Sequence, residues 1–243
     1  MELNICHLYN NVLNQCGDRS NIIALEKRCV WRNIDINLFN VSIGDAFLPE
    51  QYDIVFWGGA QEYNNKFLYY DVMNTKANAI RESIEKGKVF LCVSGGYQLL
   101  GKYFKTINGE KIECVGALDL WTVENDTRMT GNTVFECGLI RSASFDGKIV
   151  GFENHAGKTY LCENVKPLGK IIKGYGNNGE DMCEGAVYKN VFCSYSQGSL
   201  LPNNPVFADF IIQKALMNKY PDFQKLTPLD DQFEIMARHN MLI

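Results

Sequence analysis

The residues of this sequence with the clearest chemical potential stand at one tight turn, Ser94-Gly95-Gly96. Ser94 follows the apolar run Val89–Val93 and precedes a stretch that can begin a helix. A strand that passes through a glycine-rich turn into a helix exposes a side chain above backbone N–H groups that can hold an anion. The arrangement is typical of a nucleophile elbow, which serves attack on a carbonyl carbon.

A second glycine turn, Gly58-Gly59, ends the apolar run Tyr52–Trp57. A glycine pair lets backbone N–H groups approach a ligand closely. We expect the N–H groups of Gly59 and Gly95 to hold the oxyanion of a tetrahedral intermediate. A plain tight turn would explain one such pair, but two of them with a helix between are more specific.

Composition and charge narrow the function classes. The 243 residues carry a net charge of −4 and are 46% hydrophobic, which is typical of a globular protein. This charge argues against broad binding to nucleic acid. The N-terminus lacks the pattern of a signal peptide, and no apolar stretch has the length of a membrane span. We expect a cytoplasmic chain without membrane insertion.

Cysteines are frequent, but their spacing does not indicate a metal site. Nine cysteines are scattered along the chain with no C-x-x-C pair, and only three histidines are present. Buried free thiols in a reducing compartment are the better interpretation. We expect neither a metal nor another cofactor.

Strand-like and helix-like segments alternate along the first hundred residues, which predicts an α/β fold with a mostly parallel sheet. A change to short β-like runs between Gly109 and Gly198 predicts an additional antiparallel portion. We expect one domain over residues 1–204, with a helical tail over 205–243 packed on it. The predicted strands are Leu3–Tyr9, Ile34–Val41, Tyr52–Trp57, Lys88–Val93, Thr133–Cys137, Lys148–Phe152, Lys170–Tyr175, Ala186–Tyr188 and Val191–Tyr195. The predicted helices are Asn21–Arg32, Asn74–Lys86, Tyr97–Phe104, Pro205–Tyr220 and Asp230–Asn240.

Motifs along nearly the whole chain resemble those of the GatD subunits, which are glutaminase-like proteins. In that family they pair with the Mur-ligase-like MurT to amidate the D-glutamate of lipid II. The resemblance implies the flavodoxin-like, three-layer fold of the broader family, which includes the cobyric-acid and cobyrinic-acid synthases. It also implies a Mur-ligase-like partner. The motifs are Asn21–Leu25, Ser94–Gln98, Thr127–Gly131, Gly151–Gly157, Gly174–Asn178 through Glu184–Gly185, and Gln197–Pro202.

The resemblance places the two catalytic positions of the family at Ser94 and Gln197. The family uses a cysteine nucleophile at the first and a histidine base at the second. A serine hydroxyl needs a strong positioned base, and a glutamine side chain cannot accept a proton at neutral pH. Losing one member of such a unit costs on the order of 10⁴–10⁶ in rate. We therefore expect negligible hydrolysis of glutamine by the family mechanism.

Three alternatives to a natural loss of the catalytic pair stay open. Cys92 could replace the nucleophile, although its place on the strand favours a buried packing role. His155 could replace the base, although its motif favours a structural or site-wall role. An introduced inactivating substitution could explain Ser94 but not Gln197, which favours natural divergence.

Two further residues match positions that bind substrate in the family. Gln98 matches a residue that lines the glutamine pocket, and a polar residue in the first turn of a helix is the alternative. Arg128 matches an arginine suited to gripping a carboxylate by bidentate hydrogen bonds, and a surface salt bridge is the alternative. The segment Gly174–Glu184 is interpreted as a solvated acidic loop without chemistry.

Three functions are compatible with these residues. In the first, the chain is a degenerate glutaminase that stabilises or regulates a MurT-like ligase, which then uses free ammonia or another amine. Its pocket could still bind glutamine or another small amino compound. In the second, the chain is an active amidotransferase subunit with an unrecognised nucleophile or base. In the third, it is a standalone protein that binds small molecules.

Overall fold

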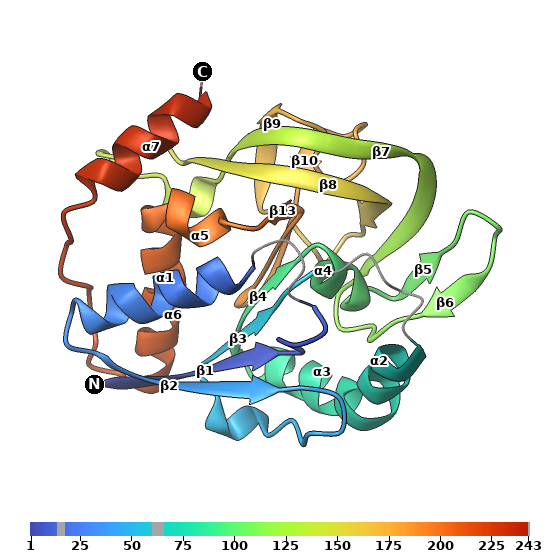
Figure 1. The fold of residues 1–243 in the computed structure, drawn as a ribbon, viewed down its shortest axis with the longest axis horizontal. Coiled ribbons are helices and arrows are strands. Elements are labelled where there is room, and N and C mark those ends of the chain that lie inside the picture. The colour runs from blue at the N-terminus through green and yellow to red at the C-terminus, as the bar shows by residue number, and fades with distance from the viewer. Residues whose placement is uncertain (14–17, 60–65, 243) are drawn as a thin grey trace.

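The computed structural model describes residues 1–13, 18–59 and 66–242, which form two β-sheets with helices around them (Figure 1). The first sheet has the strand order β11-β12-β4-β3-β1-β2, and its neighbours are parallel except for β11 and β12. Its strands are β1 (Glu2–Leu8), β2 (Asp35–Val41), β3 (Ile54–Trp57), β4 (Val89–Val93), β11 (Ala186–Tyr188) and β12 (Val191–Ser194).

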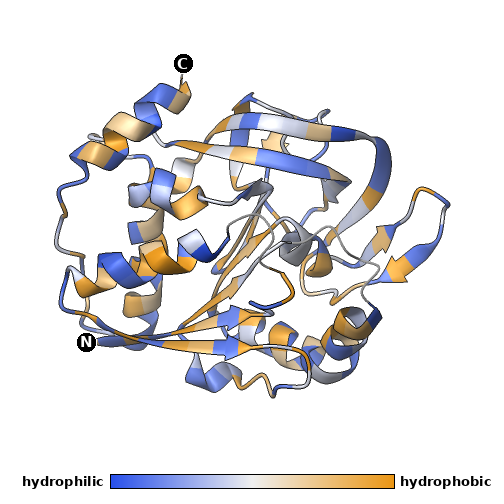
Figure 2. Cartoon of the chain, viewed as in Figure 1, coloured by the Kyte–Doolittle hydropathy of each residue, from blue (hydrophilic) through white to orange (hydrophobic). Residues whose placement is uncertain are grey.

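Helices cover both faces of this sheet, because its central strands are apolar on both sides (Figure 2). In β4, Phe90 and Cys92 face one apolar cluster, whereas Leu91 and Val93 face the other. The three layers and the order β2-β1-β3-β4-β12 confirm the predicted flavodoxin-like fold. The first face is covered by α2 (Lys66–Asp71), the π-helical turn η2 (Val72–Lys76) and α3 (Ala77–Glu85), and the second by α1 (Arg19–Val30) and α6 (Pro205–Lys219).

The second sheet supplies the predicted antiparallel portion. The strands β7 and β8 pair over most of their length, with a register shift between Glu124 and Met129. β13 pairs with β8 directly after β12 ends, so the chain passes from the first sheet to the second at Tyr195. The strands are β5 (Tyr103–Lys105), β6 (Lys111–Glu113), β7 (Leu120–Glu136), β8 (Lys148–Leu161), β9 (Gly169–Lys173), β10 (Cys183–Glu184) and β13 (Ser196–Gln197).

The C-terminal part of the chain packs against the first sheet. The apolar side chains of α6 belong to the same cluster as those of α1 and the sheet. Arg28 of α1 holds Asp209 of α6 and Asp231, which directly precedes α7. The remaining helical segments are α4 (Gly95–Leu99), α5 (Leu200–Asn203), α7 (Gln232–Leu242) and the 3₁₀ turns η1 (Pro49–Gln51) and η3 (Gly138–Ile140).

No helix among the described residues is long and apolar enough to cross a bilayer.

Several predicted helices and strands differ in length from those in the structure. The helix predicted over Tyr97–Phe104 is wrong at its C-terminal end, because α4 ends at Leu99 and Tyr103–Lys105 is strand β5. Gly101 lies between them, where a Cβ atom would be 2.5 Å from Leu120 Cδ1 and 3.0 Å from Leu120 O, so a side chain at this position would crowd β7. The helix predicted over Asn74–Lys86 is part of a longer helical segment that begins at Lys66 in the described chain.

The strands predicted over Thr133–Cys137 and Lys148–Phe152 are only parts of β7 and β8. These two strands have 17 and 14 residues, and their polar halves were not recognised in the sequence. Polar side chains are tolerated there because much of β7 is half-buried or exposed.

Candidate functional site

The elbow at Ser94 has the backbone of a nucleophile turn. Ser94 adopts φ +49° and ψ −112°, a conformation that L-residues rarely adopt and that costs about 1–3 kcal/mol. Its N–H donates to Ser194 O at 2.9 Å, and the N–H of Gly96 donates to Gly58 O at 3.2 Å. These bonds fasten the turn to β12 and to the turn after β3. The strained turn is therefore built, with Ser94 at its tip.

Gly59 lies directly against Ser94. A Cβ atom on Gly59 would be 2.5 Å from Ser94 Cβ and 3.1 Å from Gly95 N, so only glycine fits. Contrary to the prediction, the N–H of Gly59 is not a free donor, because it donates to Asp18 Oδ2 at 2.8 Å. The N–H of Gly95 forms no hydrogen bond with the described residues. Of the two predicted oxyanion donors, Gly95 alone remains available.

Asp18 connects the glycine turn beside Ser94 to the turn that carries Gln197. Its carboxylate accepts from Gly59 N at 2.8 Å and from Gly198 N, beside Gln197, at 2.9 Å. The side chain is completely buried at the start of α1. Burial raises the pKa of Asp18 to about 6, although the two backbone hydrogen bonds oppose this shift.

The Asp18 pKa predicts a particular dependence of stability on pH. A carboxyl whose pKa is higher in the folded chain than in the unfolded chain stabilises the fold fully below the unfolded value, about 3.9. That stability is lost as the pH rises through the folded value, about 6. Relative to the Asp18→Asn variant, we therefore expect the wild-type chain to lose about 2–3 kcal/mol of unfolding free energy between pH 4 and pH 7.

Urea unfolding of both chains across this range measures the difference. The amide protons of Gly59 and Gly198 should titrate together in NMR spectra, with one midpoint near 6. A wild-type chain that gains unfolding free energy relative to the Asp18→Asn variant as the pH rises would contradict the prediction. It would mean that the two backbone hydrogen bonds outweigh burial.

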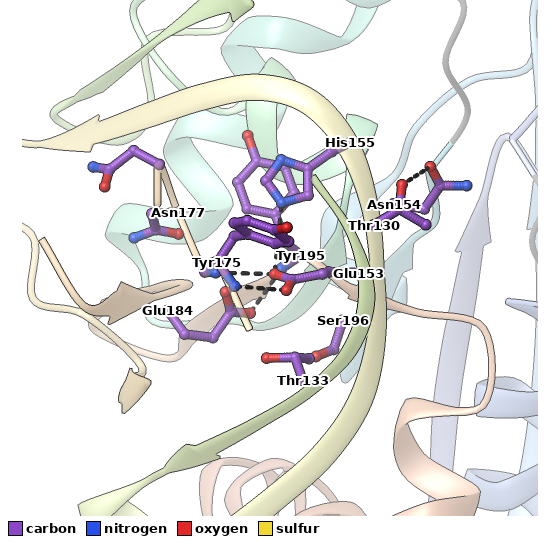
Figure 3. Close-up of polar contacts among 12 residues, drawn as sticks. Thr130, Thr133, Glu153, Asn154, His155, Tyr175, Asn177, Glu184, Tyr195 and Ser196 are labelled. Atoms are coloured by element: carbon purple, nitrogen blue, oxygen red, sulfur yellow. Dashed lines mark hydrogen bonds and ion pairs between the residues drawn. The ribbon is translucent and has the colours of Figure 1, made fainter. Parts of the chain in front are cut away.

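Asn154 joins Gln197 to Arg128 on the outward face of β8. Its backbone carbonyl accepts from Gln197 Nε2 and from Arg128 Nη2, each at 3.4 Å. Its side-chain Oδ1 accepts from Arg128 Nε. It also accepts from Thr130 Oγ1 at 3.1 Å (Figure 3). Arg128 is exposed and makes this polar contact in place of a surface salt bridge among the described residues. The structure thus brings together two of the predicted site residues, Gln197 and Arg128.

The opposite face of β8 carries a buried polar cluster, because alternate residues of a strand point to opposite sides. His155 is 4% exposed, and its ring stacks on that of Tyr195 with centroids 3.6 Å apart (Figure 3). Its Nδ1 donates to Gly157 O at 2.8 Å. Gln98 belongs to the same cluster, since its Nε2 donates to the Tyr195 hydroxyl at 2.8 Å. Both side chains are held inside the fold by these contacts.

Two fully buried carboxyl groups complete this cluster. Glu153 accepts from the backbone N–H of Tyr175 at 2.6 Å and from that of Gly176 at 2.9 Å. Glu184 accepts from Ser194 Oγ at 2.6 Å. Burial raises the pKa of Glu184, and the nearby Glu153 adds to this rise. Sequence reasoning did not identify either carboxyl, because nothing in the local pattern marks a buried glutamate.

The segment Gly174–Glu184 is not the solvated acidic loop that the sequence indicated. Asn177 and Asn178 are at most 1% exposed. Asn177 Nδ2 donates to Gly185 O, and its Oδ1 accepts from the hydroxyl of Tyr97 on α4. The carboxylates of Glu180 and Asp181 lie at the surface of this folded segment, which packs against the elbow helix.

The structure shows where Cys92, the alternative nucleophile, and the other described cysteines lie. Cys92 is completely buried in the apolar cluster beneath α3, two residues before the elbow. The eight cysteines in the described ranges are free thiols, and six of them are buried. Cys16 lies outside these ranges. In the described part of the chain, no three His, Cys, Asp or Glu side chains converge as metal ligands.

Comparison with known proteins relates this geometry to a family. The model of the CobB/CobQ-like glutamine amidotransferase domain matches residues 4–205. The chain belongs to this CobB/CobQ-like family. It is 36% identical over 231 residues to the lipid II isoglutaminyl synthase (glutamine-hydrolyzing) subunit GatD of Streptococcus pneumoniae, covering 95% of this chain and 86% of that one. It is also 36% identical to GatD of Staphylococcus aureus, covering 99% and 95% of the two chains.

Solved structures agree with the fold of the CobB/CobQ-like family. PurLQS from Thermotoga maritima superimposes with a TM-score of 0.62, covering 90% of this chain and all of the matched chain. A glutamine amidotransferase structure superimposes with a TM-score of 0.56. Because identity is 18% and 14%, these similarities concern the fold alone. The resemblance to GatD subunits that the motifs indicated is confirmed by the two sequence relatives.

Proposed function

We propose that the chain is a subunit of an amidoligase complex of the lipid II isoglutaminyl synthase type that does not hydrolyse glutamine. It binds and regulates a Mur-ligase-like partner. The observation that carries this proposal is a complete elbow and fold with Ser94 and Gln197 at the two catalytic positions. The relatives at 36% identity are named as subunits of a glutamine-hydrolysing synthase, which supports a role within a complex.

The surroundings of Ser94 and Gln197 support the loss of hydrolysis. Ser94 Oγ makes no hydrogen bond with a basic side chain among the described residues, so nothing there removes its proton. The Gln197 amide donates to Asn154 O, whereas a general base must accept a proton. Neither alternative residue compensates. Cys92 is buried between the sheet and α3, and His155 is buried against Tyr195 with its Nε2 3.8 Å from Glu153 Oε2.

The strained backbone at Ser94 favours a second candidate function, that of an active amidotransferase subunit. Positive φ at Ser94 has a cost in stability, and such strain is usually kept where a site uses it. In this case Ser94 would attack glutamine with a base supplied from elsewhere. The partner ligase would then receive ammonia from this chain.

The nitrogen source of the complex distinguishes the two candidates. We expect the chain, expressed together with its Mur-ligase-like partner, to form a stable complex that amidates its acceptor with ammonium salts but not with glutamine. The partner alone, supplied with ammonium, controls for any effect of this chain on ligase activity. Amidation driven equally well by glutamine would contradict the proposal and favour the active subunit.

A further inference from the structure

A hollow of about 430 Å³ lies beside Gln197, on the outward face of β8 and β13. Ser94 is not among the described residues that line it. Its volume lies in the range of small-molecule sites in proteins, about 300–1,000 Å³. The lining residues are Phe152, Asn154, Gln197, Gly198, Ser199, Asn203 and Met241.

The polar groups of this hollow are uncharged. Three carboxamides, from Asn154, Gln197 and Asn203, line it together with the hydroxyl of Ser199, and no acidic or basic side chain does among the described residues. Arg128 donates to Asn154 but does not line the hollow, so a charged ligand would lose its hydration there without an opposite charge among the lining residues. An uncharged ligand loses less, and its donors and acceptors can pair with the amides. The site chemistry therefore selects against ions.

Much of the hydrogen-bonding capacity of these amides is unused. The carboxamide of Asn203 makes no hydrogen bond with another described residue. The same holds for Asn154 Nδ2 and for Gln197 Oε1, although the other atoms of these residues are bound. Gln197 is only 6% exposed, so its free oxygen is aimed into a sheltered space. Free donors and acceptors thus converge from β8, β13 and α5.

Strand geometry explains why these groups face one space. Phe152 and Gln197 are a cross-strand pair of β8 and β13, and Asn154 lies two residues farther along the same face of β8. Phe152 is 42% exposed and gives the hollow one apolar wall. Met241 of α7 gives it a second. An apolar wall beside a set of amides suits a molecule with both a carbon face and polar groups.

We propose that this hollow binds a small uncharged molecule that presents hydroxyl or carboxamide groups. The site stands whether or not the chain hydrolyses glutamine, because it involves neither Ser94 nor proton transfer. It gives Gln197 a role that histidine could not fill in the same way, since a carboxamide keeps its acceptor at every pH, whereas an imidazole loses its acceptor when it is protonated.

NMR titration of the ¹⁵N-labelled chain tests the proposal, because side-chain NH₂ signals report the three amides directly. The uncharged probes are propionamide and glucose, and the charged comparators are propionate and propylammonium. We expect saturable shifts of the Asn154, Gln197 and Asn203 signals with at least one uncharged probe and with neither ion. The proposal would be overturned if neither uncharged probe shifted these signals, or if the ions shifted them equally.

Three substitutions test whether the molecule binds in this hollow. Asn203→Asp should weaken binding by about tenfold or more, because it replaces a donor with a charge that has no partner. Phe152→Ala, at an exposed position that tolerates truncation, should also weaken it. Asn218→Asp makes the same change on the exposed end of α6, outside the hollow, and should leave affinity unchanged. Equal affinity in all three variants would place binding elsewhere and overturn the proposal.

Discussion

Replacing Ser94 with cysteine and Gln197 with histidine in the same chain is expected to restore hydrolysis of glutamine. The positive φ of Ser94 shows that the elbow is already built, and the N–H of Gly95 is available beside it. Asp18 ties the turn beside Ser94 to the turn that carries Gln197, so these two positions lie near each other in the fold. A thiol next to a histidine reaches the thiolate that attacks an amide.

The two single variants are the matched controls for this result. Each supplies one half of a unit that works only as a pair, so both should stay near background, with the double variant at least about 100-fold faster. Glutamate release, measured for the four chains at equal concentration, gives the comparison. If the double variant folds but releases glutamate no faster than the single variants, the chain has lost more of the catalytic site than the cysteine and histidine.

Arg28→Ala is expected to be the most destabilising substitution considered for this chain. Arg28 is 4% exposed and donates to both carboxylate oxygens of Asp209, at 2.6 and 2.8 Å. It donates equally to those of Asp231, at 2.6 and 2.9 Å. Removing the cation leaves Asp231 without an ion-pair partner among the described residues and Asp209 with Arg32 alone, which should cost about 3 kcal/mol of unfolding free energy.

Urea unfolding measures this loss, and Arg141→Ala is the control. Arg141 pairs with Glu136 at the surface, where an ion pair contributes little, so this variant should unfold at nearly the wild-type midpoint. The Arg28 variant should also be cleaved sooner by proteases near Asp231, because the chain before α7 loses its anchor. Equal midpoints for the two variants would contradict the prediction.

Local sequence patterns predicted the central sheet and the elbow well. The strand before Ser94 was recognised because Val89–Val93 is continuously apolar, as expected for a strand covered on both faces. The helices α1 and α6 were found with small errors at their ends, because their apolar residues form a buried face. These features depend on neighbours within a few residues, which a pattern can show.

The contacts that define the site depend on residues far apart in the chain. Asp18 is 41 residues from Gly59 and 180 from Gly198, and a single aspartate in a loop carries no signal of such pairing. The contact between Arg128 and Asn154 spans 26 residues and follows a register shift in β7. The donor role of Gly59 was predicted wrongly for the same reason, since its actual acceptor lies outside its own turn.

The most direct test of the proposed loss of catalysis is the release of glutamate from glutamine by the unmodified chain in complex with the proposed Mur-ligase-like partner. The Staphylococcus aureus GatD relative, assayed with its own partner, serves as the positive control. We predict that release by this chain stays at the background measured without protein. Release at a rate near that of the relative would contradict the proposal, because Ser94 and Gln197 would then support the chemistry that we infer they have lost.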